Sequence, residues 1–260
     1  MGAVARMSIS KIAAGATDTP IEPTQTDARR KKGEATREKI LSVATRLLAE
    51  QGYNGVSLRQ VCTEAEVNLA LMSYHFGTKE KLLLAIFERG TRLINEERAR
   101  NIESLEESTA SGATADLEAI LEAFVDPTMK ATSPANPDDL NFLRLSGRMA
   151  SDPTPEVRHV ISKVYDHVAL RFVRLLRAAC KHLDDREFFM RLVFFYGAML
   201  YTRADTGRVN SIAEQMSVSI GPLSGIEASH LMIPFLAAGF RAPATPHATA
   251  SKSAASRKKR

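Results

Sequence analysis

The segment from residue 73 to residue 79 carries side chains suited to holding a DNA phosphate backbone. Ser73, Tyr74 and His75 present hydroxyl, phenol and imidazole groups in a row, and Thr78 and Lys79 follow shortly after them. Side chains of these types make most protein contacts to DNA phosphates, which orient a protein on the duplex without reading its sequence. Thr78 is also a predicted helix N-cap, so the first backbone N–H groups after it can attract a phosphate. The segment therefore predicts a phosphate clamp.

Two short predicted helices and a tight turn position this segment. Ser57 and Gln60 have the spacing of a capping box, which predicts a helix start at residue 57. A turn at residues 66–67 separates this helix from the next, which spans about 68–76. An amphipathic helix over about 36–51 precedes both, with apolar residues at helical spacing on one face. The last helix of such a unit is the one that enters a major groove.

The residues with the most specific pattern read YHFGTKEKLL over 74–83. They resemble the TetR family of bacterial repressors, and the likeness is dense between about Thr36 and Leu83 and much weaker elsewhere. The resemblance implies that Arg59 reaches a base edge or a phosphate. It further implies that the start of the second helix faces the groove with Asn68, Leu69, Ala70 and Leu71. The flanking phosphate contacts that it implies are Ser73, Tyr74, His75, Lys79 and the helix N-terminus at Thr78.

The segment also departs from the family pattern. Glu66 stands where glycine is common, which predicts backbone strain in the turn. Leu69, Ala70 and Leu71 have no hydrogen-bonding side-chain groups, so sequence reading falls to Asn68, Arg59 and DNA shape. An alternative is a three-helix cluster that has the same caps and core but does not bind DNA.

Charge is unevenly distributed along the 260 residues, whose formal net charge is +5. Residues 1–33 carry a net charge of +3 and residues 241–260 carry +6, which leaves −4 for residues 34–240. Residues 34–81, called the head below, are formally neutral. Basic ends attract a polyanion, although they can also serve only to keep the chain soluble. We predict a disordered basic arm (1–33), a helix-turn-helix DNA-binding domain (34–81), a helical effector-binding and dimerisation domain (82–240) and a basic disordered tail (241–260).

The remainder of the chain shows helical periodicity and no strand pattern, which predicts an all-α fold with an N-terminal three-helix domain and a larger helical domain. Pro127 and Pro234 are each expected to kink or end a helix. The expected helices span about 78–107, 117–127, 139–150, 154–182, 184–203, 211–217 and 225–239.

The resemblance also implies an effector cavity enclosed by the helices between about 78 and 203, and a homodimer in which the last two long helices pair with their twins. Residues 140–152, 154–165 and 231–243 look like a subgroup that includes regulators of fatty-acid and polyester metabolism responding to acyl chains. The expected partners are a pseudo-palindromic DNA operator, a small apolar or amphipathic effector and a second copy. The candidate effector residues are Phe124, Phe142, Arg148, Phe172, Phe195 and Met199. Arg144, Arg148, His167 and Arg171 are candidates for contact with an anionic headgroup, and the favoured alternative for each is a surface charge or a helix ion pair.

Other classes of protein are disfavoured. No apolar run reaches the roughly 20 residues that span a bilayer, and no secretory signal is evident, so we expect a cytoplasmic, nucleoid-associated protein with no membrane partner. Cys62 and Cys180 lie far apart, and His159 and His167 are eight residues apart, so we expect no metal site and no cofactor. Common nucleotide-binding and hydrolase motifs are missing, which disfavours an enzyme. A ligand-gated repressor and an effector-independent architectural or adaptor protein remain, and an empty cavity or a dense core would distinguish them.

Overall fold

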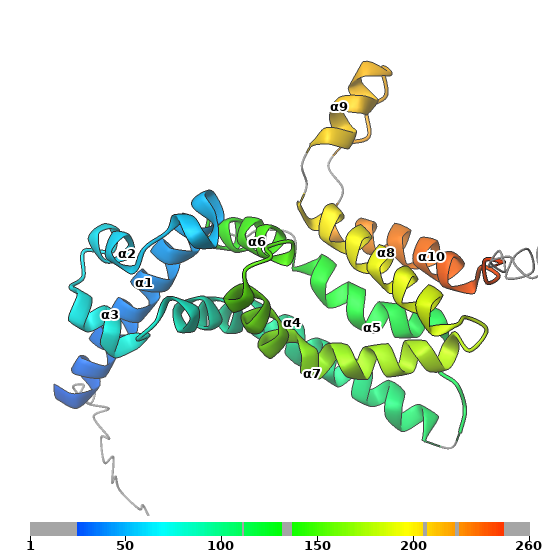
Figure 1. The fold of residues 1–260 in the computed structure, drawn as a ribbon, viewed down its shortest axis with the longest axis horizontal. Coiled ribbons are helices and arrows are strands. Elements are labelled where there is room, and N and C mark those ends of the chain that lie inside the picture. Colours follow the sequence, from blue (N-terminus) through cyan, green and yellow to red (C-terminus); the bar gives the residue numbers. More distant parts are fainter. Residues whose placement is uncertain (1–24, 111, 132–136, 205–206, 222–223, 247–260) are drawn as a thin grey trace, which may run out of the picture. The chain divides into compact units, whose positions relative to one another are not determined.

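The computed structural model describes residues 25–110, 112–131, 137–204, 207–221 and 224–246. Across these ranges it contains helices and no strand, which confirms the predicted all-α fold. Two compact units divide after Arg37. The described helices (Figure 1) are α1 (Gln25–Gly55), α2 (Leu58–Glu64), α3 (Leu69–His75), α4 (Lys79–Thr109), α5 (Leu117–Lys130), α6 (Pro137–Ala150), α7 (Pro155–Ala179), α8 (Asp185–Ala204), α9 (Arg208–Gln215) and α10 (Gly225–Arg241).

Helix α1 begins eleven residues earlier than the sequence predicts, at Gln25 rather than Thr36. The Thr36 hydroxyl donates a hydrogen bond to the carbonyl of Lys32 at 2.9 Å, so Thr36 lies inside the helix and does not cap it. Arg30 and Glu34 form an i,i+4 ion pair at 3.9 Å. The segment between them consists mainly of good helix formers, which lack an apolar face but still propagate a helix. The predicted disorder is therefore wrong for residues 25–33, and residues 1–24 lie outside the described part.

The C-terminal end of α1 is shaped by Gly52 and a side chain from another helix. Gly52 has φ 77° and ψ 172°, so the backbone leaves the helical conformation at this glycine. The Arg148 guanidinium of α6 donates to the carbonyls of Ala49 (3.3 Å) and Glu50 (3.0 Å). A Cβ at Gly52 would lie 2.9 Å from Arg148 Nε. Arg148 thus replaces hydrogen bonds that the last turn of α1 lacks.

The helix-turn-helix residues share one apolar core with α6 and α7. Helices α1 to α4 contribute their inward faces, and α6 and α7 cover them from the other side. The predicted domain boundary between residues 81 and 82 falls inside this cluster, because residues on both sides of it belong to the same core. The division into these two domains therefore stays a prediction. The larger buried members are Ile40, Leu41, Leu47, Leu48, Val61, Met72, Leu82, Leu83, Ile86, Phe87, Leu145, Met149, Val157 and Val160.

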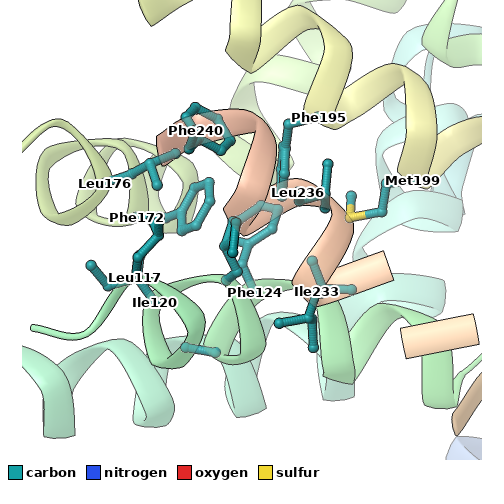
Figure 2. Packing of buried hydrophobic residues seen from close by; sticks show 14 of the residues in the cluster. Leu117, Ile120, Phe124, Phe172, Leu176, Phe195, Met199, Ile233, Leu236 and Phe240 are labelled. Atoms are coloured by element: carbon teal, nitrogen blue, oxygen red, sulfur yellow. The ribbon is translucent and has the colours of Figure 1, made fainter. Parts of the chain in front are cut away.

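A second core joins α5, α7, α8 and α10, with α4 packing along α5 and α7. Figure 2 shows Phe124, Phe172 and Phe195 converging from α5, α7 and α8 onto Leu236 of α10. The Phe124 and Phe172 rings are stacked with centroids 4.3 Å apart, and Phe172 and Phe195 lie 5.2 Å apart. These aromatic side chains fill the centre of the larger helical region.

Neither proline in a helix marks its end. α5 continues through Pro127 to Lys130, and α10 continues through Pro234 to Arg241. A proline inside a helix removes one backbone hydrogen bond and costs about 3 kcal/mol. Both helices bury residues beyond their proline, Met129 in α5 and Phe240 in α10, and this packing offsets the cost.

The chain after α10 is tied to α8, which corrects the prediction of a disordered tail for residues 241–246. Arg191 donates to the carbonyls of Gly239 (2.8 Å), Ala242 (2.8 Å) and Pro243 (2.9 Å) and also pairs with Glu187 at 2.6 Å. Glu187 in turn accepts from the backbone N–H and the hydroxyl of Thr245. The hydrogen bond from Arg191 holds the pKa of Glu187 below its ordinary value. Residues 247–260 lie outside the described part.

Replacing Arg191 with alanine should lower the melting temperature by roughly 4–8 °C, because several backbone carbonyls lose a charged donor at once. Thermal unfolding followed by circular dichroism measures the effect. Arg186→Ala is the matched control, since Arg186 lies on the same helix and is exposed. Equal melting temperatures for both variants would mean that the contacts of Arg191 do not hold the C-terminal segment.

Candidate functional site

Local caps set the start of α2 and the turn after it. The Ser57 hydroxyl accepts from the N–H of Gln60 at 3.2 Å, as predicted for an N-cap. The other half of the predicted capping box is not formed, because the Gln60 side chain donates to Gln51 at 3.2 Å. Glu66 has φ 53°, a left-handed conformation that costs energy for a residue with a Cβ. Its carboxylate pairs with Lys39 at 2.9 Å, and this hydrogen bond lowers the pKa of Glu66.

Helix α3 presents a mostly apolar surface at its start. Asn68 is its N-cap, and its side-chain oxygen accepts from the N–H of Leu71 at 2.8 Å. Leu69 and Ala70 are exposed, whereas Met72 is fully buried in the apolar core that α1 to α4 share with α6 and α7. The cap leaves the amide nitrogen of Asn68 as a donor for a base edge. An exposed leucine at the first turn suits contact with thymine methyl groups.

The predicted phosphate contacts gather at the end of α3 and the start of α4. Tyr74 is 83% exposed, and Ser73 is exposed beside it. His75 Nε2 is buried without a hydrogen-bond partner, so a contact from this atom to a phosphate would require the side chain to turn outward. The Thr78 hydroxyl caps α4 by accepting from the N–H of Lys81 at 3.2 Å.

Lys79 and Arg59 provide the positive charge of this surface. The Lys79 ammonium lies 4.2 Å from the centroid of the Tyr53 ring, a cation–π contact that fixes its position. Burial lowers the pKa of Lys79, and the nearby Glu156 carboxylate opposes that shift. Arg59 is exposed on α2. Together these groups place donors on both sides of an exposed helix start, an arrangement that can clamp a duplex backbone.

The six candidate effector residues do not line one cavity. Phe124, Phe172, Phe195 and Met199 belong to the second core, where each is at most 5% exposed. Arg148 caps α1, as described above. These positions correct the prediction that the six residues form one effector site. Large apolar residues on inward helix faces pack against one another unless something holds the helices apart.

A separate pocket of about 690 Å³ lies among α4, α6 and the end of α8. Phe142 is the one member of the candidate set that lines it. The Phe142 ring crosses α4 at Gly90, where an added Cβ would lie 2.5 Å from the ring. The lining residues are Arg89, Gly90, Leu93, Ile94, Ala131, Pro137, Asp138, Asp139, Phe142, Leu143 and Arg203.

Arg98 and Arg203, the two arginines that lie inside the larger helical region, were not identified from the sequence. Arg98 lies in the polar stretch around residues 96–100, yet it is only 3% exposed. Thr91, Asn95 and Arg98 are buried on α4 with the spacing of one helix face. That spacing, continued by Ile102, was the available signal. No pattern in the sequence around residue 203 predicted that the Arg203 side chain lines a pocket.

Two searches limited to the described ranges gave negative findings. No helix in them is long and apolar enough to cross a membrane. No group of three or more histidine, cysteine, aspartate or glutamate side chains lies together there in a way that could hold a metal ion.

Comparison with known proteins assigns both halves of the chain. Residues 40–86 match the model described as bacterial regulatory proteins, tetR family, and residues 122–239 match the tetracyclin repressor-like C-terminal domain. The chain belongs to the TetR family. Its helix-turn-helix thus coincides with the family's N-terminal domain, and the second core and the pocket lie largely in the region matched by the C-terminal model. TetR-family proteins are transcriptional regulators, a class distinct from enzymes.

Similarity to individual TetR-family proteins covers only part of the chain. The transcriptional repressor NicS of Pseudomonas putida is 30% identical over 76 residues, which is 29% of this chain and 36% of that protein. The aligned region thus spans about a third of that relative's length. The dual regulator CecR of Shigella flexneri is 27% identical over 158 residues, covering 60% of this chain and 70% of CecR. The solved structure of the fatty acid degradation regulator FadR from Bacillus halodurans has 16% identity and a TM-score of 0.50 over 79% of this chain and 96% of that one, which shows a shared fold.

Proposed function

We propose that this TetR-family chain is a ligand-responsive transcriptional repressor that binds a pseudo-palindromic operator as a homodimer. The observation that carries the proposal is the exposed start of α3 between the donors Arg59, Tyr74 and Lys79, within a matched TetR N-terminal domain. An exposed helix start flanked by phosphate donors is how helix-turn-helix proteins read a major groove. NicS is named a repressor, which favours repression. As a regulator of bacterial chromosomal DNA, the protein would act in the cytoplasm at the nucleoid.

The proposed dimer interface is an apolar surface on α8 and α10. On α10, Leu231 and Phe235 are 63% and 71% exposed and lie one turn apart, whereas Ile233 and Leu236 face the chain's own core. Of these four α10 residues, Leu231 and Phe235 therefore form the outer surface. A row of large apolar side chains at helical spacing continues on α8, and an exposed patch of this kind commonly marks an interface. The exposed members on α8 are Phe189, Met190, Val193, Phe194 and Tyr201.

A homodimer would supply the additional base contacts that a single helix-turn-helix lacks. One seven-residue helix contacts few base pairs, and two-fold pairing doubles these contacts at a fixed spacing. The basic residues 29–32, now placed in α1, would supplement the attraction of the formally neutral head.

The effector pocket is connected to the head through two helices. α4 carries Lys79 at its start and Ile94 at the pocket, and α6 carries Phe142 at the pocket and Arg148 at the end of α1. A ligand that moves Phe142 away from Gly90 would change the position of α6 relative to α4. Rigid shifts of this kind can alter the spacing of the two reading helices in a dimer and so release DNA. The pocket favours this function over an effector-independent architectural protein.

Binding-site selection from random duplexes tests the proposal. The protein should enrich a pseudo-palindrome whose half-sites lie about one helical turn, or a multiple of it, apart. Enrichment of a single unpaired half-site would contradict the homodimer, and no enrichment would contradict sequence-specific DNA binding.

A further inference from the structure

Two arginines lie inside the larger helical region without a carboxylate partner. Arg98 of α4 donates from Nε to the carbonyl of Phe124 at 2.9 Å and from a terminal nitrogen to the Thr128 hydroxyl. Its guanidinium carbon lies 3.6 Å from the centroid of the Phe124 ring. Arg203, near the end of α8, has a buried Nε with no hydrogen-bond partner. Neither guanidinium forms an ion pair with a carboxylate of the described residues.

Their charges are close enough to affect one another. Burial is the main cause that lowers the pKa of Arg98 to about 10, and the nearby Arg203 contributes to this lowering against the opposing effects of Tyr165 and Tyr196. Burial likewise lowers the pKa of Arg203, against a smaller opposing effect of Tyr165. Both groups still carry their charge at neutral pH. Positive charges removed from water without a counterion are costly, and an anion in contact with them would offset that cost.

Arg203 reaches the pocket wall, where other charged groups are already engaged. Arg89 pairs with Glu38 at 2.8 Å, and Asp138 accepts from the Ser42 hydroxyl at 2.6 Å. Asp139 also lines the pocket and has an interaction of its own. Both aspartates lie in the first turn of α6, where the helix N-terminus stabilises negative charge. Arg203 forms no ion pair with a carboxylate among the described residues, whereas Arg89 of the same pocket is paired with Glu38.

The rest of the pocket wall is largely apolar. Leu93 and Ile94 of α4 face Phe142 and Leu143 of α6 across it, and Leu93 is 66% exposed. A pocket of about 690 Å³ with several apolar lining residues and a few charged groups at its edge has the character of a small-molecule site.

We propose that this pocket binds an amphiphilic anion, whose carboxylate or phosphoryl headgroup pairs with Arg203 while its apolar body lies against Leu93, Ile94 and Phe142. The planar guanidinium of Arg203 suits either headgroup, since both accept two parallel hydrogen bonds. Arg98, held by Phe124 and Thr128, adds positive potential without needing to touch the ligand. The inference rests on the proposed function in that this anion would be the effector.

Isothermal titration of the purified protein without DNA tests the headgroup. Decanoate and decyl phosphate should bind at least about tenfold more tightly than decanol, because only the anions form charge-assisted hydrogen bonds. The tighter of the two anions identifies the headgroup. Decyltrimethylammonium should not bind. Decanol binding as tightly as both anions, or a preference for the cation, would overturn the proposal without recourse to any variant.

Arg203→Met tests the assigned residue. It should weaken binding of the anion by at least about tenfold and leave decanol binding unchanged. An arginine retained for a ligand also lowers the stability of the empty protein, so the melting temperature without ligand should stay the same or rise. Arg89→Met is the control, because Arg89 lines the same pocket but is paired with Glu38. It should change anion affinity less than Arg203→Met does.

Two results would contradict the role of Arg203. One is unchanged anion affinity in Arg203→Met, and the other is equal loss in Arg89→Met. If Arg203→Met unfolds, Arg203→Lys is measured instead and must still prefer the anion over decanol. Operator binding by the empty protein is assayed separately, so failure of anion binding with intact operator binding would overturn this inference and leave the DNA-binding function standing.

Discussion

Replacing Leu231 with glutamate should yield monomers that no longer bind the full operator. Leu231 is largely exposed on α10 beside Phe235 and lies on the opposite side of the helix from the buried Ile233. At a two-fold interface each substitution is present twice, so two carboxylates would be buried without partners. An unpaired buried charge costs about 3–5 kcal/mol, so dimer affinity should fall by more than about a thousandfold.

Sedimentation and operator titration of the same preparation measure both effects. Leu170→Glu is the control, since Leu170 is 56% exposed on α7, outside the apolar surface of α8 and α10. It should remain dimeric with parental operator affinity. A dimeric Leu231→Glu protein that binds DNA normally would place the interface on other helices.

Replacing Tyr74 with alanine should weaken binding to every DNA sequence by a similar factor, with no loss of stability. Tyr74 is 83% exposed, so its removal takes little from the core. A hydrogen bond from a hydroxyl to a charged phosphate contributes at least about 1.5 kcal/mol, and a dimer loses two of them, which predicts at least roughly hundredfold weaker binding. Because phosphate contacts carry no sequence information, specific and nonspecific DNA should be affected alike. A selective loss of operator binding would instead assign Tyr74 to a base edge.

Lys79→Gln tests the charge of the same surface through its salt dependence. Each lost phosphate contact lowers the slope of log affinity against log salt by about one, so the dimer should lose about two. Titrations at several salt concentrations give this slope. Lys181→Gln is the control because it removes the same charge from the exposed turn between α7 and α8. A Lys79→Gln protein with the parental slope would mean that Lys79 serves only its contact with Tyr53.

The head could be predicted closely because its signals are local. The caps at Ser57, Asn68 and Thr78 each satisfy an N–H three residues later, an interaction that depends on little beyond neighbouring residues. Backbone strain at Glu66 was expected because glycine is common there in the family, and its positive φ of 53° agrees with that expectation. Gln60 shows the limit of such signals, because a side chain nine residues earlier competes for it.

Predictions for the larger helical region failed where a residue's role depends on distant chain segments. Phe124 and Phe142 are both aromatic residues on inward helix faces, yet one fills a core and the other borders a pocket. Arg148 was grouped with the effector residues, but its partner is the end of α1, about 100 residues earlier. Nothing in the sequence around residue 148 specifies that partner.

The sequence by itself determined the helical class of the protein, the reading head and its caps, because periodicity and capping arise from interactions within a few residues. The tertiary structure alone decided which inward faces close into a core and which leave a pocket, and it brought Arg98 and Arg203 together from helices about 100 residues apart. It also decided that Arg191 holds the segment after α10. These outcomes depend on how helices pack against one another, and the same apolar face can serve as core, pocket wall or dimer surface until its neighbours are in place.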